Sequence, residues 1–369
     1  TYIKSADNSY YLQKIPSPKQ QQNVTLENHT QSVELDALMV MGTPQFRYDS
    51  REVKTGVRTA KDITEVARSV DIIPEQILLD SQAREMEDVY KLAPNVVNSD
   101  GYGGTREDYL IRGFRRPADI YRNGVRLKTG RRIDPATVDN IQIIKGPVAD
   151  IGQMMPGGLV NIITKKPQLE NEHHLSTSFD EHGQRRAVFD STGAIANSDN
   201  LAYRVTGSLE DSETFRDNSD IDRRSLFTSL SWFGDQGQYI NVNYEYSKEK
   251  RSFDRGVITV PLANGKRTIA DVSSDTSYDA GFSLNEVESN LIEIDTVFPI
   301  KQSGWNIESK LFYNSEKADD THVEVRGAAT DGTITRRVQG NEDRELNTFF
   351  ARLQARGEFD LVLPMTLVT

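Results

Sequence analysis

Polar and apolar residues alternate along much of the C-terminal half of the chain. Between Leu201 and Leu209 every second residue is apolar or glycine, and most of the residues between them are polar. The same period of two, which is that of side chains on an extended strand, recurs over 240–246 and 305–313. Aromatic residues stand near strand ends at Trp305 and Tyr313, as in strands that cross a lipid–water interface. The pattern predicts about nine long antiparallel strands.

The connections between these strands are expected to alternate between short and long. Tight links are predicted near residues 194–200, 234–238, 300–304 and 360–364. Roomier connections are predicted near residues 213–222, 251–285 and 318–344. A transmembrane barrel has short turns at one end and long loops at the other, whereas a soluble sandwich does not separate the two classes. The alternation favours a membrane barrel.

Four short motifs precede this region. They read Tyr-Leu-Ile-Arg-Gly-Phe at 109–114, Tyr-Arg-Asn-Gly-Val-Arg at 121–126, Ile-Ile-Lys-Gly-Pro at 143–147 and Pro-Gly-Gly-Leu-Val-Asn-Ile-Ile-Thr-Lys-Lys-Pro at 156–167. Each is a short apolar strand that ends in glycine, proline or a cation, where the backbone must turn. Asn123 and Gly124 form the preferred pair for a two-residue type I′ hairpin turn. The motifs predict a compact module of strands and tight turns.

This order of motifs resembles the plug domain of the TonB-dependent outer-membrane receptors, in particular the ferric-siderophore branch. The resemblance is dense over residues 59–167, and residues 71–75 and 88–96 are similar to the first strand and the short helix of the plug. It departs from the family at Ile151, where the family usually has tyrosine before glycine. The resemblance implies a mainly β protein: a small α+β plug domain followed by an antiparallel transmembrane β-barrel. Plugged barrels have about 22 strands, so about nine strands predict a piece of a longer polypeptide.

The resemblance also implies an order of domains. Residues 53–168 are expected to be the plug domain, and 169–369 the N-terminal part of the barrel. Residues 1–14 contain a β-like segment at 10–14 and are similar to a remnant of a periplasmic signalling domain, with a disordered tail as the alternative. Residues 15–52 are expected to be a linker, because the stretch 15–32 is polar and interrupted by prolines.

An apolar segment broken by two acids follows the polar part of this linker. In the family, that place holds the TonB box, which adds as a strand to the energising partner TonB. The resemblance therefore implies a TonB-binding segment formed by Val33, Glu34, Leu35, Asp36, Ala37, Leu38, Met39 and Val40. An ordinary edge strand or a short helix is the alternative interpretation.

Composition removes several classes of function. A net charge of −11 argues against a general nucleic-acid surface, which needs a basic stripe. The absence of cysteine excludes disulfides, zinc–thiolate sites and cysteine nucleophiles. No run approaches the roughly 18 apolar residues of a membrane helix, but barrel strands escape that test because they alternate. The chain begins at Thr1 without a signal peptide, so an export signal is expected to have been removed or left out.

Enzyme and metal signatures are weak. The glycine-rich stretch at 101–105 lacks the spacing of a dinucleotide-binding loop, and the stretch at 264–268 lacks the first glycine of a P-loop. His173, His174 and His182 could meet across a hairpin, but histidines at strand ends are usually solvated. We predict no catalysis, no metal site and no cofactor.

Cations gather in three predicted loops of the plug, at 102–106, 115–117 and 128–132. By resemblance these loops form the apices that touch the iron complex. An acidic chain has no general reason to concentrate cations there, so a local anion site is plausible. The predicted substrate-binding residues are Tyr102, Arg106, Arg115, Arg116, Lys128, Arg131 and Arg132. Plug arginines can instead pair with acids on the barrel wall, and that alternative stays open.

The resemblance thus implies a receptor in the outer membrane of a Gram-negative bacterium that imports a ferric siderophore with energy from TonB. The expected partners are TonB, the siderophore, outer-membrane lipid and, if a signalling domain exists, an anti-sigma regulator. Iron would arrive as the siderophore chelate and no nucleic acid is involved. Cobalamin, heme or a glycan are alternative cargoes, and a soluble β-rich binding protein is the rival of another class.

Overall fold

The protein is described here by a computed structural model that covers residues 2–4, 10–12, 48, 50–55, 60–99, 101–117, 119–129, 131–147, 156–301, 303–360 and 364–368. It separates into two compact units, Thr1–Asp36 and Ala37–Thr369. In the first unit, β1 (Tyr2–Lys4) pairs with β2 (Tyr10–Leu12) as an antiparallel hairpin, so the β-like segment near residue 10 is a strand. The predicted linker at 15–32 and the predicted TonB box at 33–40 lie outside the described residues.

A five-stranded sheet forms the centre of the module that carries the four motifs, called the plug below. Its strands stand in the order β10–β9–β12–β11–β5; β9 and β12 are parallel and the other neighbours antiparallel. Their bounds are β5 Ser69–Pro74, β9 Asp119–Arg122, β10 Val125–Lys128, β11 Val138–Lys145 and β12 Gly158–Thr164. β11 and β12 are almost wholly buried, and about half of their residues are isoleucine, leucine or valine.

Smaller elements surround this sheet. They are β3 Glu52–Val53, β4 Lys61–Asp62, η2 Ile63–Glu65, α1 Glu75–Asp80, α2 Met86–Tyr90, β6 Val96–Asn98, β7 Asp108–Ile111, β8 Phe114–Pro117 and η3 Pro135–Thr137. α2 buries Met86, Val89 and Tyr90, which share one helical face. The helix predicted within 88–96 thus exists but lies earlier and ends at Tyr90, before Asn95 adopts a φ of 62°.

Two tight turns of the plug follow the sequence prediction. Asn123 and Gly124 have φ angles of 47° and 80°, and Arg122 pairs with Val125 across them. Positive φ at both central residues is the mark of a type I′ turn, so that prediction is confirmed. The turn between β7 and β8 likewise places Arg112 and Gly113 at positive φ.

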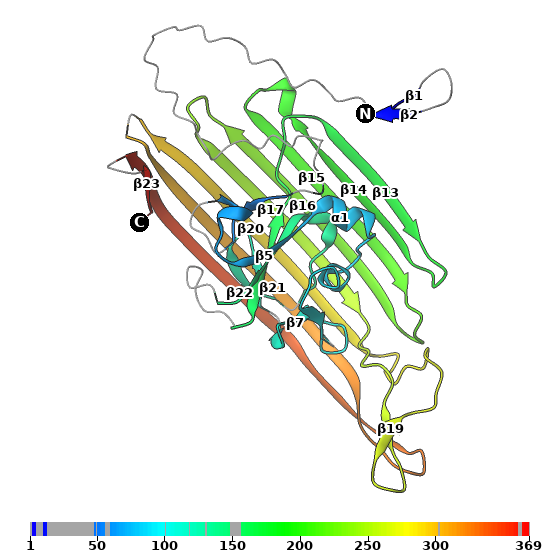
Figure 1. Cartoon of the computed structure of the whole chain (residues 1–369). Coiled ribbons are helices and arrows are strands. Elements are labelled where there is room, and N and C mark those ends of the chain that lie inside the picture. Colours follow the sequence, from blue (N-terminus) through cyan, green and yellow to red (C-terminus); the bar gives the residue numbers. More distant parts are fainter. Residues whose placement is uncertain are drawn as a thin grey trace, which may run out of the picture. The chain divides into compact units, whose positions relative to one another are not determined.

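Nine antiparallel strands form one large sheet, called the wall below, in which neighbours follow the sequence order (Figure 1). The strands are β13 Glu172–Phe179, β14 Arg185–Ala194, β15 Leu201–Glu213, β16 Asp220–Phe233, β17 Tyr239–Arg251, β20 Leu284–Ile300, β21 Trp305–Ala328, β22 Ile334–Asp360 and β23 Pro364–Val368. The short turn η5 (Ile195–Asn197) joins β14 to β15. The prediction of about nine strands is confirmed.

Alternation in the wall is inverted relative to a soluble sheet. On β17 the polar residues Asn241, Asn243 and Glu245 are buried, whereas Val242 and Tyr244 on the other face are exposed. The same holds on β15, where Arg204, Thr206 and Ser208 are buried while Leu209 is 61% exposed. Apolar side chains that face outward over many strands need an apolar solvent, as in a transmembrane barrel. Among the described residues, no helix is long and apolar enough to span a bilayer.

The lengths of the wall's connections agree with the sequence in part. The four predicted tight links lie where expected, and the connection from 252 to 283 is long and carries the small hairpin β18 (Thr259–Pro261) and β19 (Arg267–Ile269). The predicted roomy loop at 318–344 is wrong, because β21 and β22 continue to Ala328 and from Ile334. Its polar residues are paired backbone to backbone in a long hairpin, which needs no apolar side chains to satisfy its amides.

The plug lies against one face of the wall (Figure 1). Val125 and Leu127 of β10 pack with Leu291 and Phe312 of β20 and β21 in an apolar cluster. Charged contacts surround it: Lys165 of the plug binds Asp190 of β14 at 2.9 Å, and Asn123 donates to Glu293 of β20 at 2.7 Å. Outside this apolar cluster, most buried side chains on this face of the wall are polar or charged, and several of them pair with polar groups of the plug.

Candidate functional site

The plug tip is a tight turn between β6 and β7. Gly101, Tyr102, Gly103 and Gly104 all have positive φ, from 52° to 79°, and the amide of Arg106 donates to the carbonyl of Gly101 at 2.9 Å. Three glycines make such a run of left-handed conformations possible, and Tyr102 is its exception. The turn projects one aromatic side chain from the end of the plug.

Tyr102 meets two rings supplied by the wall. The ring of Phe253, in the long connection after β17, lies 5.4 Å from the Tyr102 ring in an edge-on arrangement. His322 of β21 stacks on Phe253 at 4.1 Å, and its Nε2 is 3.1 Å from the Tyr102 hydroxyl. The backbone holds these parts together, because the amide of Asp254 donates to the carbonyl of Gly103 at 2.9 Å. The three rings form one aromatic group built from plug and wall.

Two cations lie over the aromatic group. The guanidinium carbons of Arg106 and Arg255 are 4.8 Å and 5.7 Å from the centre of the Tyr102 ring. The Gln339 side-chain amide of β22 donates to the Tyr102 hydroxyl. These side chains are called the apical cluster: Tyr102, Arg106, Phe253, Arg255, His322 and Gln339. Phe253 and His322 are buried, whereas Tyr102, Arg106 and Arg255 remain partly exposed and can contact a flat or anionic ligand.

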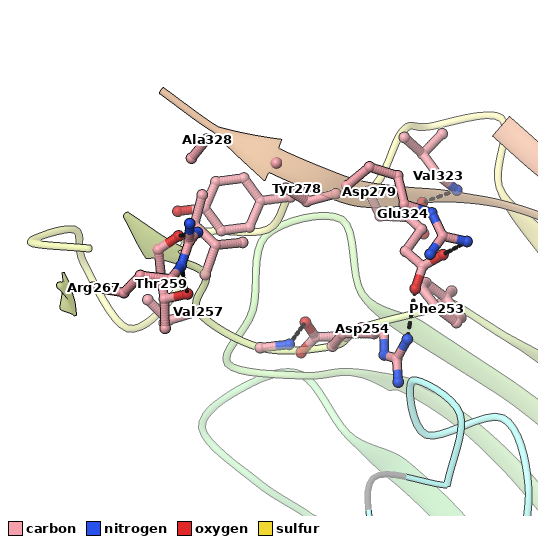
Figure 2. Close-up of a pocket in the computed structure, with 16 residues that line it drawn as sticks. Phe253, Asp254, Val257, Thr259, Arg267, Tyr278, Asp279, Val323, Glu324 and Ala328 are labelled. Carbon is pink, nitrogen blue, oxygen red and sulfur yellow. Dashed lines mark hydrogen bonds and ion pairs between the residues drawn. The ribbon is translucent and has the colours of Figure 1, made fainter. Parts of the chain in front are cut away.

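A pocket of about 310 Å³ adjoins the apical cluster. One side is formed by residues 253–259 and by Arg267, Tyr278 and Asp279 of the long connection, and the other by residues 323–328 of β21. Figure 2 shows Tyr278 and Arg267 at one end and Glu324 with Phe253 and Asp254 at the other. The pocket and the cluster share Phe253 and Arg255, so one ligand can reach both.

The structure brings two of the predicted binding residues, Tyr102 and Arg106, into this cluster. Arg115 and Arg116 do not lie in a loop as predicted, because both belong to β8, which pairs with β7. The Arg115 Nε donates to the buried carboxylate of Asp108 at 2.7 Å. Lys128 closes β10; the side chains of Arg116 and Lys128 lie outside the described part of the structure.

Arg131 and Arg132 are only 2% and 3% exposed and pair with protein carboxylates. The Arg131 Nη1 is 2.6 Å from Glu245 of β17, which also binds the buried Arg122 at 2.5 Å. Arg132 binds Glu85 at 2.8 Å and also Glu87, and it donates to the carbonyl of Gly104 at 2.8 Å. These contacts favour the alternative in which plug arginines fix the plug.

The acids around Arg132 differ in their proton affinity. Glu85 is buried, which opposes ionisation, but Arg251, Arg132 and Arg223 together hold its pKa well below its usual range. Glu107 has no such set of cations. Burial and the neighbouring Glu87 raise the pKa of Glu107 to about 8, against the attraction of Arg132. A carboxyl that is mostly protonated at neutral pH therefore lies beneath the plug tip.

Four members of the apical cluster escaped the sequence analysis: Phe253, Arg255, His322 and Gln339. Phe253 and Arg255 lie in an irregular connection, and His322 and Gln339 lie in a stretch that resembled a loop. Apolar and polar residues alternate only over 323–326 in this stretch, and no local pattern shows that it meets the plug. Within the described residues, no group of three or more potential ligand side chains could hold a metal ion.

Residues 62–159 match the family described as TonB-dependent Receptor Plug Domain. The chain is 31% identical over 218 residues to the metal-pseudopaline receptor CntO of Pseudomonas aeruginosa, covering 58% of this chain and 31% of that protein. It is 26% identical over 319 residues to the ferrioxamine receptor of Yersinia enterocolitica, covering 83% of this chain and 44% of that protein. The chain spans less than half the length of each of these relatives.

Solved structures share the fold. The crystal structure of the ferripyoverdine receptor of the Pseudomonas aeruginosa outer membrane superposes with a TM-score of 0.78 at 19% identity, covering 86% of this chain and 43% of that one. The closed form of the ferric-catecholate import receptor Fiu of Escherichia coli gives a TM-score of 0.76 at 19% identity, over 85% and 47% of the two chains. Residues 62–159 thus match a TonB-dependent receptor plug domain, and plug and wall together share the fold of these solved receptors.

Proposed function

We propose that the protein acts as an outer-membrane receptor that binds a ferric siderophore outside the cell and imports it with energy from TonB. The observation that carries this proposal is the apical cluster. It joins the plug tip to the long connection and long hairpin of the wall, so a ligand bound there touches the part that must move and the parts that face outward. The relatives are named as receptors, and the proposal includes no catalysis.

Two rows of outward-facing residues support a lipid environment. Lys248, Glu288, Lys317 and Glu345 are neighbours on successive strands from β17 to β22. A second row lies four positions away from the first on each strand. It is formed by Tyr244, Ile292, Tyr313 and Phe349, each of which is at least 37% exposed. A charged row next to an aromatic and apolar row is the expected boundary between headgroups and hydrocarbon. The charged row lies nearer the long connection, and long connections of transmembrane barrels face outward, which supports an outward-facing apical cluster.

The chemistry of the cluster supports an anionic, partly aromatic cargo. Arg106 and Arg255 present guanidinium groups beside the ring of Tyr102. The similar proteins are named as receptors for metal-pseudopaline, ferrioxamine and ferripyoverdine, and two of these three names specify iron. Iron is therefore cargo in this proposal, and no resident cofactor is required.

Tight binding of the cargo makes its release slow, so import needs an external source of energy. A scavenger that binds with a dissociation constant near 1 nM gains about −12 kcal/mol. With an association rate of about 10⁶ per molar per second, the complex lasts on the order of a quarter of an hour. Inward release needs work, which we assign to TonB acting through residues 33–40. If the first unit belongs to a signalling domain, an anti-sigma regulator is a further partner.

Uptake of radiolabelled iron tests the proposal. The full-length receptor would be expressed in iron-limited Gram-negative cells that lack their own siderophore receptors, with hydroxamate, catecholate and carboxylate chelates supplied separately. At least one chelate should bind and enter. If no chelate binds but heme, cobalamin or a glycan does, the cargo class is wrong.

The Leu38→Pro variant tests the coupling in the same cells. Proline removes a backbone donor, so strand addition to TonB should fail and uptake should stop while surface binding persists. Leu38→Val is the matched control, because it keeps the donor. Normal uptake by Leu38→Pro would remove the assignment of residues 33–40 as the TonB-binding segment.

A further inference from the structure

Two side chains of the long hairpin β21–β22 hold the hydroxyl of Tyr102. The Nε2 atom of His322 lies 3.1 Å from this hydroxyl, and the side-chain amide of Gln339 donates to it. His322 and Gln339 are direct partners across the hairpin, on the part of β21 that continues beyond the last paired residue of β20. Because Tyr102 belongs to the plug, these contacts join the plug tip to the hairpin.

The orientation of the Gln339 amide follows from its other neighbours. Its side-chain oxygen accepts from Nη2 of Arg326 at 3.3 Å and from Nη2 of Arg337. A guanidinium group can only donate, so the Gln339 atom that faces both arginines must be the oxygen. The nitrogen of the amide therefore faces Tyr102, and the oxygen of Tyr102 is the acceptor of that hydrogen bond.

The surroundings of His322 decide which of its ring nitrogens carries the proton. The Nδ1 atom lies 3.8 Å from the carboxylate of Asp320, which is 5% exposed and accepts from the side-chain amide of Asn341 at 3.3 Å. A proton on Nδ1 is attracted by this carboxylate, whereas a lone pair there would be repelled. In the neutral ring the proton is therefore on Nδ1, and Nε2 carries the lone pair that accepts from the Tyr102 hydroxyl.

Burial favours the neutral form of the His322 ring. The residue is only 2% exposed, and this burial lowers the pKa of its imidazole from the ordinary value of 6.5. Arg106 acts on the pKa in the same direction. The carboxylates of Asp320, Asp279 and Glu324 attract a proton to the ring, but they only partly offset the effect of burial. At neutral pH, His322 is thus an uncharged acceptor for the hydroxyl of Tyr102.

The hydrogen bond to His322 helps to hold the tip of the plug. Tyr102 has a φ of 55°, a left-handed conformation that is unfavourable for a residue with a side chain and that tertiary contacts must maintain. The guanidinium group of Arg106 lies over the same ring, 4.8 Å from its centre. Rotation of the Tyr102 side chain would therefore move both the ring and the cation that a ligand can contact.

We propose that His322 is a positioning residue for the cargo: its Nε2 atom accepts from the Tyr102 hydroxyl and keeps the Tyr102 ring and Arg106 where the cargo binds. This inference rests on the proposed function and adds a pH range to it. A protonated His322 has no lone pair, so it cannot accept from Tyr102, and it places a positive charge near Arg106. The binding form is the unprotonated one, so affinity should be complete well above pH 6.5 and should fall as the pH drops below that value.

Binding of ferric chelates to the purified full-length receptor at about pH 7.5 and about pH 5.5 tests the proposal. The probes are a ferric trihydroxamate, a ferric tris-catecholate and ferric citrate. Between these pH values the native receptor should lose about fivefold in affinity relative to His322→Gln, which keeps a neutral acceptor at both. The comparison cancels protonation of the chelate itself. At about pH 7.5 the two proteins should agree within about twofold.

A second pair of variants isolates the hydrogen bond from the packing of the ring. His322→Phe keeps a ring beside Phe253 and removes the acceptor, so it should weaken binding about fivefold at about pH 7.5. Tyr102→Phe removes the other partner of the same hydrogen bond. The double variant should therefore bind like Tyr102→Phe alone. If His322 acted only through packing, His322→Phe would keep the native affinity.

His174→Gln is the matched control, because it removes a histidine of β13 whose side chain is 54% exposed and bound to Glu172. It should keep the native pH dependence. The positioning role is overturned if His322→Gln retains the native pH dependence, or if His322→Phe binds like the native receptor. If none of the three chelates binds the native receptor at about pH 7.5, the proposed function fails. A chelate that binds the native receptor and all variants equally removes only the role of His322.

Discussion

The apical cluster and the plug–wall contacts both depend on arginine, but they use it differently. Arg106 lies over the ring of Tyr102 and keeps part of its surface exposed. Arg131 and Arg132, at the base of the same plug tip, are buried and bound to Glu245, Glu85 and Glu87. A protein carboxylate uses up the donors of a guanidinium, whereas an aromatic ring contacts its face and leaves the edge free.

The two environments predict different costs of mutation. A buried charge pair that loses one partner leaves an uncompensated charge, which costs about 3–5 kcal/mol. A cation over an exposed ring contributes only about 0.5–1 kcal/mol to folding, so its loss should be felt mainly by a ligand. Mutation of a buried, paired arginine in a plug loop should therefore lower stability, whereas mutation of an accessible arginine in a similar loop should weaken ligand binding.

The largest expected effect is that of Arg132→Ala on stability. The change leaves Glu85 and Glu87 without one of their cations and removes donors to the carbonyls of Gly104 and Arg106. Plug stability, measured by hydrogen exchange of the α2 amides in detergent, should fall by about 3–5 kcal/mol. Lys91→Ala is the control, because its pair with Asp88 is on the surface and should matter by at most about 1 kcal/mol. Equal protection in both variants would contradict the structural role of Arg132.

The second effect is on pH dependence and concerns Glu107. Its pKa is about 8 in the folded protein against an ordinary value of 4.5, so its contribution to stability is complete below about pH 4.5 and is lost as the pH rises through 8. The loss should reach a few kcal/mol, at roughly 1.4 kcal/mol per pKa unit.

Glu107→Gln should remove this slope, because the amide stays neutral. The measurement is the free energy of plug unfolding from pH 5 to pH 9 in both proteins. Each unit of pKa shift changes it by about 1.4 kcal/mol. Glu85 acts in the opposite direction at low pH, since its lowered pKa gives stability that is lost on acidification, and it is common to both proteins. Parallel curves for the two proteins would show that Glu107 is ionised throughout.

The third effect compares Arg106 with Arg131 directly. Arg106→Ala should weaken binding of a ferric chelate by roughly tenfold with little change in stability, because it removes an accessible charge-assisted contact. Arg131→Ala should instead destabilise the plug, because Glu245 is left with Arg122 alone. Calorimetric titration and thermal unfolding of the same two samples give both readouts. The reverse assignment of effects would show that Arg131 is the ligand contact.

The smallest effect isolates the packing of Phe253 on the plug tip. A Cβ at Gly103 would lie 2.5 Å from the Phe253 ring, whereas a Cβ at Gly104 would meet nothing within 4 Å. Both residues have positive φ, 69° and 79°, so alanine costs similar backbone strain at either place. Gly103→Ala should therefore weaken chelate binding about threefold more than Gly104→Ala, by displacing Phe253. Equal affinities would mean that Phe253 does not shape the site.

Local sequence was sufficient for much of the fold. The type I′ turn at Asn123 and Gly124, the strands around the four motifs and the nine wall strands followed from patterns that span a few residues each. It failed at 318–344, where polarity suggested a loop and the chain forms a long hairpin. Backbone pairing satisfies polar strands as well as apolar ones, so polarity alone cannot mark a strand's end.

By itself, the sequence determined that the chain has a plug of tight turns, a wall of alternating strands and cations concentrated near the plug tip. Only the tertiary structure decided what each cation does. Arg131 meets Glu245 across 114 residues, and Tyr102 meets His322 across 220. Propensity and periodicity act between near neighbours in the chain, whereas the partner of a charge or ring depends on the path of the whole backbone.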